Sequence, residues 1–436
     1  MRLRDFLEMD FSLFFAALIL SVFGILFIYS SGVTSAGVLV STEYMRQIVW
    51  AIGGMILALA LALINYRRFY DLSLYLYLGT IILLIYTCLF GRLVNGARAW
   101  IGIGSFGIQP SEFSKITTIL FLARYLDSSK KSRNTFVRFA CSCIIVFLPM
   151  AIILLQPDFG TSLVFIPILL VMTFIAGLSI RYVAFLGICI MLASLFMALP
   201  LWQSYILGNN SSFFMILTNI RFAAITMLVL ALIMVIALLG YIWYKKRYFY
   251  WIVYTAAIII FSLGASFAAQ KVLKDYQIMR LIVFLDPNVD PRGSGWNIIQ
   301  SITAIGSGGL LGKGYLHGTQ SHYRFLPQQS TDFIFTMLPD EWGLLGGVLV
   351  FILFLLICLR LVKIMKSTAD PFGCYIAAGL SSMYIFHFLV NVGMTMGIMP
   401  ITGIPLLFMS YGGSALTSAM AGIGFALSIY IRRFRH

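Results

Sequence analysis

Long apolar runs recur along this 436-residue chain and are separated by short polar segments. Because lipid offers the backbone no water, a run of about 20 apolar residues is predicted to be a membrane-spanning helix. The strict alternation of a transmembrane β-strand does not occur in these runs. The pattern predicts an all-α, polytopic integral membrane protein with about twelve spans, at residues 11–30, 47–64, 70–90, 111–126, 136–155, 159–177, 182–201, 222–243, 249–269, 342–362, 373–396 and 404–431.

The composition excludes a water-soluble protein. The chain is 61% hydrophobic and only 10% charged, whereas soluble proteins average about 25% charged residues. The first apolar run follows Arg2 and Arg4, as in a secretory signal peptide. Its apolar core exceeds the roughly 7–15 residues of such a signal, so we expect it to remain as the first span.

The basic residues are distributed unevenly across the predicted membrane. The chain carries 30 Lys+Arg against 15 Asp+Glu, a net charge of +15. With the N-terminus in the cytoplasm, 19 of the 30 basic residues fall in cytoplasmic segments, which carry +13, while the rest of the chain carries +2. This bias satisfies the positive-inside rule, so the excess of positive charge does not require a nucleic-acid partner.

Two polar stretches interrupt the spans, at 91–110 and 270–341, and both are predicted to be extracytoplasmic loops. Loops of this length are uncommon unless they are functional. Within the second, residues 296–305 have the apolar spacing of an amphipathic helix lying in the outer interface. The six cysteines lie within or near spans and the four histidines are scattered, so neither a disulfide framework nor a metal site is predicted.

Two glycine-rich segments imitate nucleotide-binding motifs. Gly102–Gly107 matches GxGxxG, but it lies between two spans, outside the strand–turn–helix context of a dinucleotide site. Gly308–Gly314 suggests a phosphate loop, yet its spacing is wrong and Gly314 stands where Ser or Thr is required. These glycines are expected to permit tight turns, or close approach of the backbone to a lipid headgroup.

Ionisable residues at membrane depth are costly and therefore mark candidate sites. Glu112 and Lys115 lie three residues apart at the start of a short predicted span, on one face of the helix. They form either a pair that neutralises its own charge or part of a functional site. Pro110 and Glu112 also fit a helix N-terminus, with proline and an acid in the first turn.

A second group of candidates lies near the outer interface. Arg98 and Trp100 either anchor the protein at the interface or bind an anion through the guanidinium and a sugar through the indole. Arg46 precedes the second span on the same side and could add a cation. Asp158 opens the sixth span, where an N-cap is its simplest role.

Carboxylates gather at the end of the long polar stretch. Asp332 is followed at once by the apolar run 333–335, which places it at a boundary between water and lipid. Partial desolvation would raise its pKa and make it a better base, while capping of the next helical turn is the alternative. Asp340 and Glu341 open the tenth span and are rival candidates.

These residues occur in motifs that resemble the SEDS family (shape, elongation, division and sporulation), and its RodA branch more than its FtsW branch. The likeness covers nearly the whole chain. The matching stretches are Asn95–Trp100, Gln109–Lys115, Gln156–Thr161, Phe284–Pro291, Gln300–Gly309, Leu326–Phe335, Gly403–Leu406 and Ser410–Ser414, and Gly314–Ser321 indicates RodA.

The resemblance implies a peptidoglycan glycosyltransferase that polymerises lipid II on the outer face of the cytoplasmic membrane. It implies a class B penicillin-binding protein as the transpeptidase partner, within the machinery of cell elongation. Asp332 matches the family's essential loop aspartate, and Glu112 and Lys115 match its functional Glu and Lys. Arg98 and Trp100 match its loop Arg and Trp, and Arg46 and Asp158 match less closely.

The chain departs from the family pattern in three ways. Family members usually have ten spans, so 203–265 is interpreted as an inserted helical pair of unknown role. Gln328 and Ser330 replace residues that are often Glu and His, and Asp340 stands where Glu is common. None of these changes removes Asp332.

The expected reaction is attack by the 4-hydroxyl of GlcNAc in one lipid-linked molecule on C1 of MurNAc in another, with undecaprenyl pyrophosphate leaving. Asp332 would take the hydroxyl proton, while Lys115 and Arg98, with Arg46, would stabilise the developing negative charge. Glu112 would hold Lys115 or contact a substrate hydroxyl. A divalent cation could assist at the pyrophosphate, although no metal cluster demands one.

Two other functions fit a polytopic protein with these residues. A lipid II flippase would need charged groups along a path through the membrane midplane, whereas the candidates here gather at the outer face. A structural scaffold of the elongation machinery would tolerate the substitution Asp332→Asn.

Overall fold

The protein is almost entirely helical and divides into two units. The computed structural model describes residues 9–94, 97–103, 106–131, 134–203, 215–272, 275–323 and 325–433. The first unit comprises Met1–Leu178 and Gln300–His436, and the second comprises Ser179–Ile299. Within the described ranges, ten helices are long and apolar enough to cross a membrane. The prediction of an all-α, polytopic membrane protein is therefore confirmed.

The predicted count of twelve spans is not confirmed, because two of the predicted spans are atypical helices. Helix α5 (Pro110–Ser128) carries four charged residues and is not apolar enough to count as a span. The predicted span 159–177 is divided between α7 (Phe159–Leu163) and α8 (Phe165–Ile175), which together form only a short apolar segment. Both segments nevertheless pack within the first unit.

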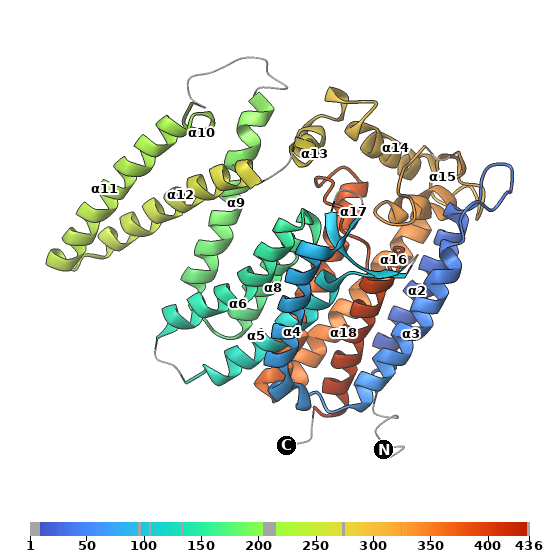
Figure 1. Cartoon of the computed structure of the whole chain (residues 1–436), viewed down its shortest axis with the longest axis horizontal. Helices are drawn as coiled ribbons and strands as arrows, with labels where there is room; N and C mark the ends of the chain where they lie inside the picture. The colour runs from blue at the N-terminus through green and yellow to red at the C-terminus, as the bar shows by residue number, and fades with distance from the viewer. Residues whose placement is uncertain are drawn as a thin grey trace. The chain divides into compact units, whose positions relative to one another are not determined.

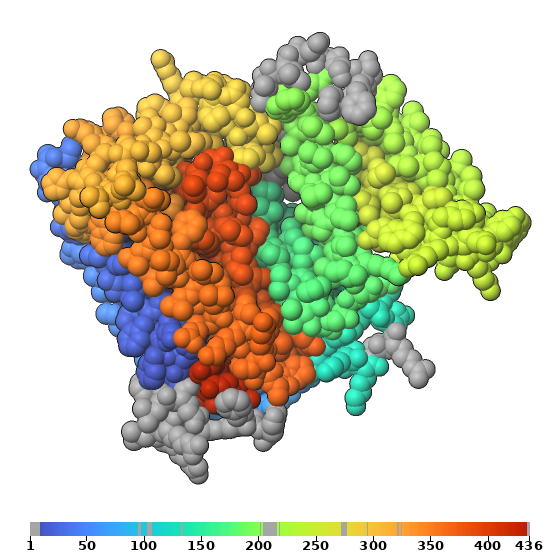
Figure 2. Space-filling view, turned by 180° about the vertical axis from the view of Figure 1, so that it is seen from behind, coloured from blue at the N-terminus to red at the C-terminus, as the bar shows by residue number. Residues whose placement is uncertain are grey.

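The first unit is a bundle built around its last helix. Helix α18 (Gly413–Ile431) is almost entirely buried and contacts α2, α3, α5, α16 and α17, as Figure 1 shows. Figure 2 shows the surface of α16 and α17 (orange) beside that of α2 (blue). The other long helices of this unit are α2 (Phe11–Ser31), α3 (Glu43–Leu63), α4 (Arg68–Phe90), α6 (Thr135–Leu155), α16 (Ile334–Ser367) and α17 (Pro371–Thr395).

Successive helices of this bundle run in opposite directions, which sorts its connections into two ends (Figure 1). The connections 32–42, 91–109, 156–158, 308–333 and 396–412 share one end, which we call the loop end. The short connections after α3, α5 and α16 share the other end with the start of α2 and the end of α18. This second end is basic, with Arg67, Arg68, Lys130, Lys131, Lys366, Arg432 and Arg433.

A small antiparallel sheet occupies the predicted loop 91–110, where the all-α prediction contained no strand. Its strands are β1 (Arg92–Val94), β2 (Ala97–Ile103) and β3 (Phe106–Ile108), in the order β1-β2-β3. Ile101 pairs with Ile108 and Gly102 with Gly107, so the described residues of the GxGxxG segment belong to neighbouring strands. This hairpin is not a dinucleotide-binding strand–turn–helix.

Helix α16 begins earlier than the sequence predicts. It starts at Ile334 rather than at 342, and the backbone breaks at Gly343, with φ 65° and ψ −162°. The glycine-rich segment packs against this break, because a Cβ at Gly308 or Gly312 would meet the carbonyl oxygen of Pro339 or Glu341 at 1.7 or 2.1 Å. The glycines therefore permit close approach to the backbone of α16, and the expectation of a lipid headgroup there is not needed.

The second unit contains a long helical hairpin. Helices α11 (Ile220–Tyr244) and α12 (Arg247–Val272) pack against each other, and α9 (Ile180–Trp202) packs against α12. Figure 2 shows α9 in green beside these two helices in yellow-green. Lys245 makes the turn with φ 53°. The remaining elements are α10 (Met215–Thr218), α13 (Asp275–Leu285), a 3-10 turn (Pro287–Val289) and the start of α14 (Ser294–Ser307).

Two predictions concern these segments. Helix α14 covers 296–305, so the helix predicted there is confirmed, and its placement in the membrane interface stays a prediction. The helices α11 and α12 occupy most of the segment interpreted as an inserted pair, 203–265, of which 204–214 lies outside the described residues.

Candidate functional site

A buried cluster of three ionisable side chains joins α5 to α17. The ammonium of Lys115 lies 2.8 Å from a carboxylate oxygen of Glu112 and 3.1 Å from Nε2 of His387. The exposed fractions of the three residues are only 0%, 2% and 1%. A buried charge needs a partner of opposite charge and further hydrogen bonds, and Glu112 and His387 supply both. We call these three residues the α5–α17 cluster.

The start of α5 aligns the pair. Pro110 occupies the first turn after the N-cap residue Gln109, and Glu112 lies in that turn, where a negative charge is favoured by the helix dipole. Lys115 follows three residues later and therefore lies on the same face. The predicted pair is thus present as a direct ion pair, which is the self-neutralising arrangement; a further chemical role of these residues stays a prediction.

Asp158 lies beside this cluster. It is the N-cap of α7, with one carboxylate oxygen 3.1 Å from the backbone nitrogen of Thr161, so the predicted capping role is confirmed. Its other oxygen accepts a hydrogen bond of 2.7 Å from the side chain of Gln109. Burial raises the pKa of the Asp158 carboxyl and the charge of Glu112 raises it further, whereas the hydrogen bond from Thr161 lowers it. Asp158 is therefore joined to the start of α5 through Gln109.

Asp332 is half-buried at the loop end, immediately before α16. The N-cap of α16 is Phe333, so the alternative in which Asp332 caps that helix is wrong. The backbone carbonyl of Asp332 accepts a 3.0 Å hydrogen bond from the amide of Asn391 on α17. The three residues after it are buried, as their apolar character predicts. Asp332 thus lies where the loop enters the bundle.

The segment before α18 connects these positions. The hydroxyl of Ser410 donates to the carbonyl of Thr331 (2.6 Å), and the amide of Gln47 donates to the carbonyl of Ser410 (3.1 Å). The hydroxyl of Ser414 accepts from the backbone nitrogen of Gln109 (2.9 Å) at the start of α5. The chain around 410–414 therefore ties together the approach to Asp332, the helix of Arg46, and the helix of Lys115.

Arg46, Arg98 and Trp100 share the loop end but do not join the α5–α17 cluster. Arg46 is half-buried on α3, and Arg98 is exposed on β2. Within the described part of the chain, neither guanidinium makes a hydrogen bond or an ion pair. Trp100 covers Gly107, where a Cβ would lie 2.9 Å from the indole. The structure thus leaves both cations available at the loop end and uses Trp100 to pack the hairpin.

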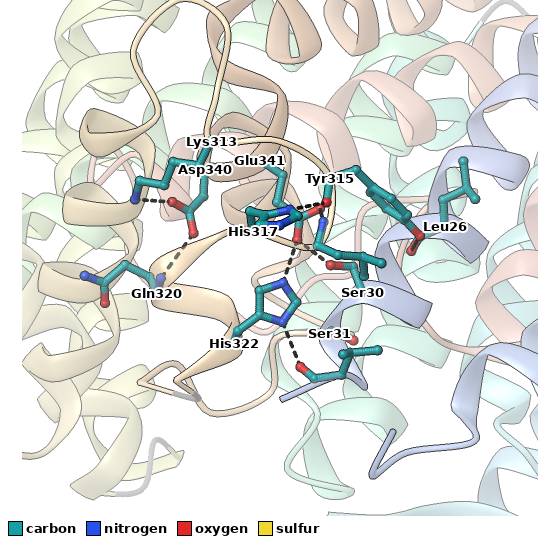
Figure 3. Close-up of polar contacts among 12 residues, drawn as sticks. Leu26, Ser30, Ser31, Lys313, Tyr315, His317, Gln320, His322, Asp340 and Glu341 are labelled. Carbon is teal, nitrogen blue, oxygen red and sulfur yellow. Dashed lines mark hydrogen bonds and ion pairs between the residues drawn. The ribbon is translucent and has the colours of Figure 1, made fainter. Parts of the chain in front are cut away.

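Asp340 and Glu341 form a second buried cluster (Figure 3). Lys313 lies 2.6 Å from a carboxylate oxygen of Asp340, and the backbone nitrogen of Gln320 donates to the other oxygen (3.2 Å). The hydroxyl of Ser30 and the backbone nitrogen of Leu316 donate to Glu341. His322 approaches Glu341 at 3.6 Å. We call Ser30, Lys313, His322, Asp340 and Glu341 the α16–loop cluster.

The α16–loop cluster attaches the loop 308–323 to helix α16. The backbone carbonyls of Asp340 and Glu341 also accept from the backbone nitrogens of Lys313 and Gly314. The carboxylate of Asp340 binds the loop through Lys313 and Gln320, and that of Glu341 binds the loop through Leu316 and α2 through Ser30. Among the described residues, no group of three or more His, Cys, Asp or Glu side chains is placed to hold a metal ion.

Sequence reasoning missed two polar residues on α17. His387 and Asn391 are 1% and 0% exposed, and they contact Lys115 and Asp332. His387 is the one histidine that falls inside a predicted span, and an ionisable residue there marks a candidate site. That signal was available in the sequence, whereas the contacts to Lys115 and Asp332 required the fold.

Comparison with known sequences settles the family. The family model for FtsW, RodA and SpoVE, described as "Cell cycle protein", matches residues 11–220 and 211–434. The chain belongs to the SEDS family. It is 51% identical to the peptidoglycan glycosyltransferase RodA of Treponema pallidum over 99% of this chain and 100% of the relative. It is 32% identical to the peptidoglycan glycosyltransferase MrdB of Escherichia coli K12 over 98% of this chain and 95% of the relative.

A solved structure of a SEDS-like fold agrees with this assignment. One chain from a study of the "structural coordination of polymerization and crosslinking by a peptidoglycan synthase complex" is 27% identical, with a TM-score of 0.66. The match covers 98% of this chain and 99% of that chain. The resemblance stated from the sequence motifs is therefore confirmed over the full length.

Proposed function

We propose that this protein is a peptidoglycan glycosyltransferase that polymerises lipid II into β-1,4-linked glycan strands during cell elongation. The observation that carries the proposal is the full-length similarity to relatives named as peptidoglycan glycosyltransferases. Asp332, Glu112 and Lys115, which match the family's functional positions, lie at one end of the same bundle. The protein is a multi-pass membrane protein, and its substrates would be held in the same bilayer.

The proposed chemistry assigns one task to each group. Asp332, which is half-buried at the loop end, removes the proton from the attacking sugar hydroxyl. The exposed Arg98 and the half-buried Arg46 receive the pyrophosphate of the lipid-linked donor. Lys115 contributes positive charge from a site of low dielectric, where it stabilises the negative charge that develops on the leaving group. Glu112 holds Lys115 in place, and Asp158 holds Gln109 at the start of α5.

The charge of the first unit supports an orientation for this site. Its basic end carries the arginine and lysine residues that the positive-inside rule places in the cytoplasm. The loop end, with Asp332 and Arg98, then faces the outer side of the cytoplasmic membrane. The polymer would be passed there to a class B penicillin-binding protein, in line with the complex of polymerisation and crosslinking that the similar structure represents.

The helical hairpin α11–α12 is proposed to be an addition to the family core. The family model matches residues 11–220 and 211–434, which overlap at 211–220 and together include α11 and α12, so the proposal rests on the count of predicted spans alone. The extracytoplasmic segments 91–110 and 270–341 would supply the catalytic loop end, and α11–α12 would be dispensable for the chemistry.

The proposal is tested with the purified complex of this protein and its transpeptidase, supplied with lipid II in detergent or vesicles. Wild-type protein should form glycan polymer, and Asp332→Ala should abolish it while the complex and the thermal unfolding midpoint stay unchanged. Undiminished polymer from Asp332→Ala would exclude Asp332 as the base. Movement of lipid II across vesicles without any polymer from the wild type would favour a flippase instead.

A further inference from the structure

Two buried polar residues lie one turn apart on α17. His387 and Asn391 are separated by four positions, so they lie on the same face of the helix. Both face the chain segment Gly403–Ser410 and both are nearly inaccessible to solvent. An imidazole and a carboxamide are costly to bury without hydrogen bonds, and all of their polar atoms except the carboxamide oxygen of Asn391 have a partner among the described residues. The hydrogen bonds of His387 and Asn391 therefore show which parts of the chain these two residues position.

The hydrogen bonds of His387 fix its tautomer. Nδ1 lies 3.1 Å from the carbonyl oxygen of Pro405, which can only accept, so Nδ1 carries the proton. Nε2 then presents its lone pair to the ammonium of Lys115 at 3.1 Å. His387 is thus a neutral acceptor for Lys115 and is at the same time fixed to the segment Gly403–Ser410.

Asn391 makes the matching pair of contacts one turn later. Its amide nitrogen donates to the carbonyl of Ile404 (2.8 Å) and to the carbonyl of Asp332 (3.0 Å). Because both partners are carbonyl oxygens, the orientation of the carboxamide is unambiguous. His387 therefore binds the backbone carbonyl of Pro405, and Asn391 binds the adjacent carbonyl of Ile404. The second hydrogen bond of His387 joins it to the ammonium of Lys115, and that of Asn391 joins it to the backbone carbonyl of Asp332.

We propose that His387 and Asn391 are positioning residues, which hold Lys115 and the backbone at Asp332 on one rigid support formed by α17 and Gly403–Ser410. This inference rests on the proposed polymerase function and adds two residues to it. The support is continuous, because Ser410 accepts from the nitrogen of Leu406 (2.8 Å) and donates to the carbonyl of Thr331. A base and a cation that act in the same transition state need such fixed separation, and small displacements lower the rate strongly.

The test compares four variants of the full-length protein in complex with its transpeptidase. His387→Leu removes both hydrogen bonds at similar volume, and His387→Gln retains an acceptor for Lys115 and a donor for Pro405. Asn391→Asp replaces the two donors with acceptors that face carbonyl oxygens. Ser382→Ala on the same helix is the matched control, because among the described residues the partner of its buried hydroxyl is the carbonyl of Gly379 within α17.

Polymerisation of lipid II is measured as kcat and KM, with thermal unfolding of each variant as a control for folding. We expect kcat to fall about 10- to 100-fold in His387→Leu and Asn391→Asp with KM changed less than about threefold, because positioning acts on the transition state. His387→Gln should recover to within about fivefold of the wild type, and Ser382→Ala should keep the wild-type kcat.

Two results would overturn the inference: a wild-type kcat in His387→Leu or Asn391→Asp, or equal losses in His387→Leu and His387→Gln. A rise in KM at constant kcat would also contradict it, since this indicates a role in binding alone. Failure of the wild-type complex to polymerise lipid II would instead refute the proposed function, so the two failures are distinguishable.

Discussion

The two buried clusters of the first unit hold their charges in different ways. In the α5–α17 cluster, the ammonium of Lys115 has two partners among the described residues, the side chains of Glu112 and His387. In the α16–loop cluster, Asp340 and Glu341 accept from backbone nitrogens of the loop as well as from side chains. Contacts made by side chains change when a rotamer changes, whereas contacts made by the backbone change only when the chain itself moves.

This difference explains why the rival carboxylates are not equivalent candidates. Asp340 and Glu341 are fully buried, and most of their partners lie in the loop that they anchor, with Ser30 on α2 and Ser307 on α14 as further donors. Using either as a base would release the loop from α16. Asp332 keeps its backbone tied to Asn391 and its side chain half-buried at the loop end. The second cluster therefore supports the loop, while a chemical role for Asp332 and for the α5–α17 cluster stays a prediction.

The largest effect is expected from removing both charges of the α5–α17 cluster. The double variant Glu112→Leu with Lys115→Met leaves no buried charge unpaired, so its stability should stay within about 2 kcal/mol of the wild type. Polymerisation should nevertheless fall by at least about 100-fold, because charge stabilisation of the transition state is lost. Gel analysis of glycan chains and the thermal unfolding midpoint measure the two effects.

The single variant Lys115→Met is the control for this prediction. It leaves the carboxylate of Glu112 buried and unpaired, and should destabilise the protein by about 3–5 kcal/mol. A double variant that polymerises normally would show that Glu112 and Lys115 only neutralise each other. The α5–α17 cluster would then be structural, like the α16–loop cluster.

The next largest effect is expected in the glycine-rich loop of the α16–loop cluster, where substitutions should lower the free energy of unfolding. Gly312 has φ 78°, and a Cβ there would lie 2.1 Å from the carbonyl oxygen of Glu341. Gly312→Ala should therefore cost about 3 kcal/mol or more, from strain and from displacement of the loop. Gly309 has φ 59° with open space around it, so Gly309→Ala should cost only about 1–2 kcal/mol. Equal midpoints for the two variants would contradict the close packing of loop and helix.

The smallest effect is expected for Glu341→Gln. The amide can keep the acceptor for Ser30 or for Leu316 but loses the negative charge, which should cost about 1–2 kcal/mol. Polymerisation per folded molecule should remain within about threefold of the wild type, and limited proteolysis should cut 308–323 more readily. A loss of activity with an unchanged midpoint would make Glu341 a functional carboxylate after all.

The helices could be predicted largely because apolar runs have one stable form in lipid. Eleven of the twelve predicted runs overlap one helix each, including α5, whose charges lower its hydropathy, and the run 159–177 is divided between α7 and α8. The sheet β1–β3 was missed because its strands are short and depend on pairing with each other. The early start of α16 was missed because Pro339 and Asp340 interrupt the apolar pattern, although the helix continues through them to the break at Gly343.

The candidate site was only partly accessible to sequence reasoning. Glu112 and Lys115 are three residues apart, so their contact follows from helix geometry alone. Asp158 could be predicted as a cap from its position before an apolar run. His387 is 272 positions from Lys115 in the chain, and no local pattern relates the two.

The sequence by itself determined that the chain is a helical multi-pass membrane protein, and it also determined the family and the local pair Glu112–Lys115, since these depend on composition, motifs and helical spacing. Only the tertiary structure decided that Asp340 and Glu341 anchor the loop and that Asp332 lies half-buried at the loop end. It also decided that α17 and the segment before α18 bring His387 to Lys115 and Asn391 to Asp332. The reason is physical: local spacing fixes neighbours within a helix, whereas contacts between helices depend on how the whole bundle packs.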